Sequence, residues 1–137
     1  MRKHSWFKFN VSRWLGDQHL VLAGSTARGV LIDLMAIAHD GVPYGYVTNG
    51  GLPITDTELA RSRRERVTTV HRAVLKLIEL GRVGRTAEGI LYIPAMVRDA
   101  EQHQKHVEHG SMGGNPKLLE KGQAGVKPGV KPGVKAE

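Results

Sequence analysis

Basic side chains gather between residues 61 and 85 of this 137-residue chain. The stretch has eight basic and two acidic residues, a net charge of +6 within a chain whose formal net charge is +7. The basic residues are Arg61, Arg63, Arg64, Arg66, Arg72, Lys76, Arg82 and Arg85, and the acids are Glu65 and Glu79. Charge of one sign repels itself unless a polyanion balances it, so the cluster favours a nucleic-acid partner.

Start and stop signals place this cluster on a helix–turn–helix. Thr55 with Glu58 three residues later forms a capping box, which predicts a short helix ending near Arg63. A second helix is predicted over 66–80, with Gly81 as the residue that ends it. Its buried face is predicted to consist of Val67, Val70, Val74, Leu77 and Ile78.

The outer face of the second helix follows by subtraction and consists of Arg66, Thr68, Thr69, Arg72, Ala73 and Lys76. A helix of this kind enters the major groove, where arginine binds guanine and threonine contacts the thymine methyl group. Phosphates at the edge of the groove are the expected partners of Arg61, Arg63 and Arg64. We expect Glu65 to pair with one of the neighbouring arginines, and the alternative is that it accepts a hydrogen bond from a cytosine amine.

Two short strands, 82–86 and 90–94, are predicted to form a hairpin around Gly89, which can take the positive φ of a tight turn. Arg82 and Arg85 flank this hairpin and would reach the adjacent DNA backbone or minor groove. The remaining predictions are an extended aromatic arm over 5–15, a short connection over 17–23, a helix capped by Ser25 or Thr26 and running to about His39, a strand over 43–47, a turn over 49–51 and a polar helix over 96–109.

The predicted fold is therefore mainly α with a small β-hairpin, a winged helix–turn–helix domain over residues 1–110. The Gly, Lys and Pro-rich residues 111–137 are predicted to be a disordered tail or linker. The absence of cysteine excludes a disulfide framework and thiolate metal sites. No apolar run is long enough to span a bilayer and no hydrophobic segment follows the basic start, so we expect a cytoplasmic, nucleoid-associated protein with no membrane partner.

Other kinds of site are less well supported. His103, His106 and His109 recur every three residues and drift around a helix, so they do not converge on a metal. The glycine-rich segment 23–29 lacks the Gly-Lys-Ser/Thr ending of a phosphate-binding loop. The aromatic arm could stack on single-stranded bases, but its rings are more plausibly needed in the core. We expect no enzyme activity, cofactor or metal.

Several short motifs together resemble the N-terminal winged-helix domain of phage and prophage replication proteins, of the replisome-organiser or replication-initiation type. The resemblance covers residues 5–118. The motifs are Trp6-Phe7-Lys8-Phe9, 14–17, 27–34, 43–46, Glu58-Leu59-Ala60-Arg61, 80–83, 96–99 and Gly113-Gly114-Asn115-Pro116. The resemblance implies an origin-binding domain joined by a linker to a part that recruits a replication helicase or its loader. The printed sequence stops at Glu137 within the repeats, so such a part is either absent or lies outside this chain.

The leading hypothesis is a non-enzymatic protein that binds double-stranded DNA in replication initiation of a mobile element. One alternative is a transcriptional regulator on the same fold, since fold alone does not separate the two roles. Another is a protein–protein module of the replisome without DNA binding. A homo-oligomer is compatible with each hypothesis.

Overall fold

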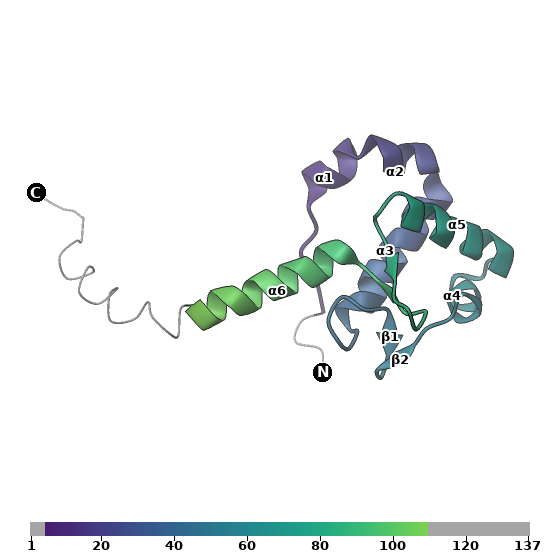
Figure 1. The fold of residues 1–137 in the computed structure, drawn as a ribbon. Coiled ribbons are helices and arrows are strands. Elements are labelled where there is room, and N and C mark those ends of the chain that lie inside the picture. Colours follow the sequence, from purple (N-terminus) through teal and green to yellow (C-terminus); the bar gives the residue numbers. More distant parts are fainter. Residues whose placement is uncertain (1–4, 110–137) are drawn as a thin grey trace, which may run out of the picture. The chain divides into compact units, whose positions relative to one another are not determined.

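The computed structural model describes residues 5–109, and the predicted tail lies outside them (Figure 1). Within that range the chain is mainly helical with two small antiparallel hairpins, the predicted α+β class. The elements are α1 (Val11–Gly16), α2 (Gln18–Ala23), α3 (Ser25–His39), β1 (Thr48–Asn49), β2 (Leu52–Pro53), α4 (Asp56–Arg63), α5 (Val67–Glu79), β3 (Gly84–Arg85), β4 (Leu91–Tyr92) and α6 (Pro94–His109). The chain divides into two units, Met1–Ala100 and Glu101–Glu137.

The N-terminal segment is not the extended arm that the sequence predicts. Residues 11–16 form α1, because the Asn10 side chain accepts a hydrogen bond from the Arg13 N–H (2.9 Å) and so caps a helix start. Trp14 packs against the core from this helix, whereas Trp6 is 67% exposed. The predicted connection over 17–23 contains α2, with Asp17 as its N-cap.

The helix predicted from residue 25 to about His39 is confirmed as α3, but its predicted cap is wrong. Gly24 occupies the N-cap position, and neither Ser25 nor Thr26 makes a side-chain cap hydrogen bond. Ser25 and Thr26 already have helical backbone geometry, whereas a capping side chain must come from the flanking residue.

The core of the first unit is built around the contact between α3 and α5. Apolar side chains at helical spacing on both helices become almost fully buried, and α2, α4 and the segments flanking the hairpins add to them. These residues include Leu20, Val30, Leu34, Val47, Leu59, Val70, Val74, Leu77, Val83, Leu91 and Ile93. Burying side chains of this size stabilises a fold by about 1.5–3 kcal/mol each relative to exposure.

The strand predicted over 43–47 is wrong as a regular strand. Pro43 has no N–H to donate, and Gly45 takes a φ of 92°, which a strand does not accommodate. Only an isolated bridge joins Tyr46 to Tyr92, supported by the hydrogen bond from the Val47 N–H to the Leu91 carbonyl (2.8 Å). The following turn at Gly50 and Gly51 is confirmed and connects β1 with β2.

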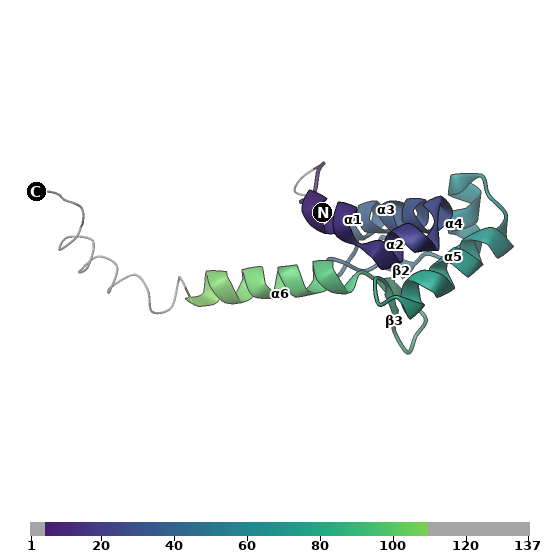
Figure 2. The ribbon, with the colours of Figure 1, turned by 90° about the horizontal axis from the view of Figure 1, so that it is seen from above.

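The hairpin after α5 is confirmed, with shorter strands than predicted. Gly84 pairs with Tyr92 and Arg85 with Leu91. Gly89 has a φ of 91° in the turn, the conformation for which glycine is favoured. Seen from above, this hairpin and α5 lie on one side of the domain, and α1 and α3 lie on the other (Figure 2).

The predicted capping box at the start of α4 is confirmed. The Glu58 N–H donates to Thr55 Oγ1 (3.1 Å) and the Thr55 N–H donates to Glu58 Oε1 (2.9 Å). At the other end of α4, Arg64 has left-handed backbone geometry (φ 58°, ψ 44°), and α5 begins three residues later. The reversal between the two helices therefore depends on a single unusual backbone conformation.

Arg63 fastens α4 to α3. Its Nη1 donates to Asp33 Oδ2 on α3, and its Nε donates to Glu65 Oε1 (2.7 Å) in the turn. The guanidinium lies against Gly29, where an added Cβ would stand 3.4 Å from Nη2. Gly29 and Asp33 are four residues apart and so share one face of α3. Because Gly29 has no side chain, the Arg63 guanidinium can lie against the helix next to the Asp33 carboxylate.

Replacing Arg63 with methionine should therefore lower the free energy of unfolding by about 2 kcal/mol, because charge-assisted hydrogen bonds to two carboxylates are lost. Urea denaturation measures this change. Arg61→Met in the same helix is the matched control, since Arg61 is exposed, and should alter stability by less than about 0.5 kcal/mol. Equal effects of the two substitutions would contradict the proposed role of Arg63.

Candidate nucleic-acid interface

The helix α5 separates into a buried and an exposed face, with two differences from the sequence prediction. Ala73 was expected to face outward but is 6% exposed, because it shares the i, i+3, i+4, i+7 stripe with Val70, Val74 and Leu77. Val67 was expected to be buried but is 42% exposed in the first position of the helix. The outer face thus consists of polar and charged residues together with a few apolar ones.

Most of the predicted basic residues are exposed on α4, α5 and the hairpin. Arg61, Arg64, Arg66, Thr68 and Arg72 are exposed, and Thr69 is half-buried. The Lys76 ammonium lies 3.6 Å from Glu79 Oε1, in a solvent-exposed pair of a kind that contributes little to stability. Arg85 is exposed on β3, with its guanidinium 3.3 Å from the Gly89 carbonyl that accepts its hydrogen bond.

Arg63 is predicted to meet phosphates, but in the structure it is set apart from these exposed residues by its ion pairs. Its side chain is 15% exposed and its donors point to Asp33 and Glu65. The pairing expected for Glu65 is confirmed by the same contact. An arginine held by two carboxylates is electrically neutralised, which removes both its donors and its charge from an approaching polyanion.

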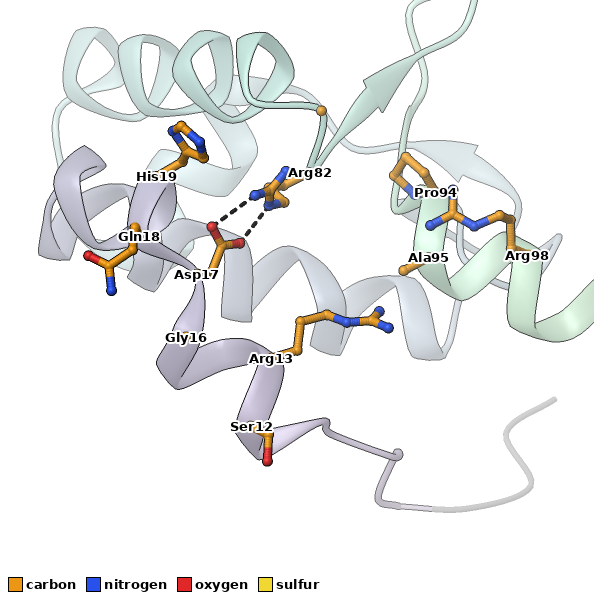
Figure 3. Close-up of a pocket in the computed structure, with 11 residues that line it drawn as sticks. Ser12, Arg13, Gly16, Asp17, Gln18, His19, Arg82, Pro94, Ala95 and Arg98 are labelled. Atoms are coloured by element: carbon orange, nitrogen blue, oxygen red, sulfur yellow. Dashed lines mark hydrogen bonds and ion pairs between the residues drawn. The ribbon is translucent and has the colours of Figure 1, made fainter.

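Arg82 is likewise paired with a carboxylate, although its side chain is 34% exposed. Its Nε and Nη2 donate to the two oxygens of Asp17 (2.7 and 2.8 Å), and its Nη1 donates to the Leu80 carbonyl (2.6 Å). Figure 3 shows this two-pronged contact between the start of α2 and the segment that follows α5. The bidentate contact engages the guanidinium, so the predicted contact of Arg82 with DNA would compete with Asp17.

One contact within the helix pair was not foreseen from sequence. His71 Nδ1 lies 2.6 Å from Asp56 Oδ2, which joins the second turn of α5 to the first turn of α4. The His71 side chain is 53% exposed. A carboxylate fifteen residues upstream has no local sequence signal that would assign it to this histidine.

What remains is a surface of six cations: Arg61, Arg64, Arg66, Arg72, Lys76 and Arg85. They come from the end of α4, the turn, the outer face of α5 and β3. The elements α5 and β3, which carry Arg72, Lys76 and Arg85, lie on the same side of the domain (Figure 2). We call this set of six residues the basic surface.

The structure gives two further results on other kinds of site. Across the described range 5–109, no group of three His, Asp or Glu side chains is placed to hold a metal ion. His103 and His106 are exposed on α6, and the side chain of His109 lies outside the described set. No helix among these residues is long and apolar enough to cross a membrane.

Comparison with known proteins adds no relative, since no family model, curated protein or solved structure matches this chain.

The contact between Asp17 and Arg82 makes stability depend on acid pH. The hydrogen bond from Arg82 is the main reason that the pKa of the Asp17 carboxyl lies below its ordinary value. A carboxyl whose pKa is lower in the folded state contributes stability above its unfolded pKa and loses it as the pH falls through its folded pKa. The contribution of Asp17 should therefore disappear below about pH 4.

Asp17→Asn should flatten the acid limb of a plot of unfolding free energy against pH, because asparagine still caps α2 but cannot titrate. Chemical denaturation at a series of pH values measures the slope. Asp99→Asn removes an exposed carboxyl instead and should leave the slope almost unchanged. If Asp17→Asn kept the slope of the wild-type protein, Asp17 would not be the source of the acid dependence of stability.

Proposed function

We propose that the first unit is a winged helix–turn–helix domain that binds double-stranded DNA through the basic surface. In this reading α4 and α5 are the helix pair, α5 is the recognition helix and the β3–β4 hairpin is the wing. The observation that carries the proposal is the basic surface itself: six exposed cations spread over the end of α4, the turn, α5 and β3. Duplex DNA carries a negative charge about every 1.7 Å along its axis, so it matches such a surface.

The ion pairs of the domain support this reading. The arginines that secure the fold have acidic partners, Asp33 and Glu65 for Arg63 and Asp17 for Arg82. In the residues that the structure describes, Arg61, Arg64, Arg66, Arg72 and Arg85 have no ion pair, and Lys76 has only a long one to Glu79. Acidic residues are thus placed where a fixed arginine is needed and are sparse where a polyanion would bind.

The position of residues along α5 suggests how the helix would meet DNA. The N-terminal residues of a recognition helix contact base edges in the major groove. Arg66 and Thr68 stand in that part of α5 and are exposed. Arginine suits guanine and threonine suits the thymine methyl group, so these two side chains are the proposed base readers.

A double substitution of Arg66 and Arg72 by alanine should weaken duplex binding by about 10-fold or more, since each contact contributes on the order of 1 kcal/mol or more. Fluorescence anisotropy with a labelled duplex at low salt measures the affinity. The control is Arg13→Ala with Arg98→Ala, which removes two exposed arginines outside the basic surface. An equal loss in both double variants would show that net charge, and not this surface, drives binding.

We further propose that the DNA bound is a replication origin of a mobile element, a role supported by the resemblance of residues 5–118 to phage and prophage replication proteins. The test is selection of bound fragments from the replicon that encodes this chain. Enrichment of fragments from the origin is the expected result. Enrichment of promoter fragments instead would favour a transcriptional regulator on the same fold.

A further inference from the structure

A hollow of about 270 Å³ lies between the junction of α2 and α3 and the outer side of α5. Ala23, Ala27 and Ala73 line its inner part, and their small side chains leave the space open. Thr26 on α3 and Thr69 on α5 bring hydroxyl groups to it. The hollow therefore combines an apolar base with donors from two helices.

The charged side chains that line this hollow are all positive. Arg72 and Lys76 line it from α5, and no acidic residue does. Three other hollows of the described domain differ, since each has Asp17, Asp99 or Glu58 in its lining. Glu79, the neighbour of Lys76, is 70% exposed and does not line the hollow. An anion would meet a guanidinium, an ammonium and two hydroxyls there, and no carboxylate lines the hollow.

The place of the hollow on α5 indicates which part of a duplex would reach it. Bases lie at the bottom of the major groove and are read by the side chains that project furthest from the protein. The hollow lies instead where α5 meets the α2–α3 junction. An element beside the recognition helix meets the strand that borders the groove, whose hydrogen-bond acceptors are phosphate oxygens.

We propose that this hollow is a seat for a backbone phosphate of the bound duplex, with Thr26, Thr69, Arg72 and Lys76 as its donors. This inference rests on the proposed function and deepens it. Arg72 and Lys76 are then backbone contacts that set affinity and position, while Arg66 and Thr68 read bases. Thr26, which precedes the basic cluster by more than thirty residues, becomes part of the interface.

The test places a carboxylate in the hollow. Thr26 is the second residue of α3 and is exposed, and Ser12 has the same position and exposure in α1. A glutamate in the first turn of a helix interacts favourably with the helix dipole, so both Thr26→Glu and Ser12→Glu should fold. The two variants of the full chain change net charge equally. A thermal unfolding midpoint no lower than that of wild type confirms folding in each.

Binding is measured against a panel of duplexes of different sequence and at several salt concentrations. Thr26→Glu should weaken binding at least tenfold for every duplex and reduce the slope of log affinity against log salt by about 1. The order of preference among the duplexes should stay the same. Ser12→Glu should change affinity less than threefold.

The outcomes separate the two proposals. Failure of the wild-type chain to bind any duplex at low salt would remove the proposed function, and the phosphate seat with it. Wild-type binding with equal effects of Thr26→Glu and Ser12→Glu would overturn the seat alone. A changed order of preference in Thr26→Glu would also overturn it, because the hollow would then face bases.

Discussion

The arrangement of the helix pair depends on the guanidinium of Arg63. It joins three parts of the chain that hydrophobic packing alone would leave free to slide: Asp33 on α3, the end of α4 and Glu65 in the turn. Apolar contacts are non-directional, whereas a guanidinium binds carboxylates only in its own plane. The same residue that ends α4 therefore also fixes the direction in which α5 departs.

A consequence is that the basic cluster in the sequence serves two purposes. Arg63 and Arg82 secure the fold. Asp33 and Asp17 lie thirty and sixty-five residues before them in the chain, and Glu65 lies two residues after Arg63. The other six basic residues form the basic surface. A count of charges along the sequence treats all eight alike, because Asp33 and Asp17, which help to separate them, are brought close to Arg63 and Arg82 only by folding.

Local signals predicted the parts of the fold that depend on local chemistry. The Thr55–Glu58 box, the end of α5 before Gly81 and the turn at Gly89 are all confirmed, since each rests on hydrogen bonds or φ values within a few residues. The N-terminal arm was wrong because one residue, Asn10, starts a helix in a segment whose aromatic pattern suggested an extended chain. The burial of Ala73 and the Asp17–Arg82 contact depend on which helices pack together, which no local pattern encodes.

The left-handed backbone conformation of Arg64, between α4 and α5, makes the domain less stable than it would be with glycine at that position. Arg64 is the one non-glycine position with positive φ among residues 5–109, and a side chain there costs roughly 1 kcal/mol relative to glycine. Glycine would relieve that strain but would remove an exposed guanidinium from the point where the two helices meet. The turn thus gives up part of its stability and keeps an exposed cation.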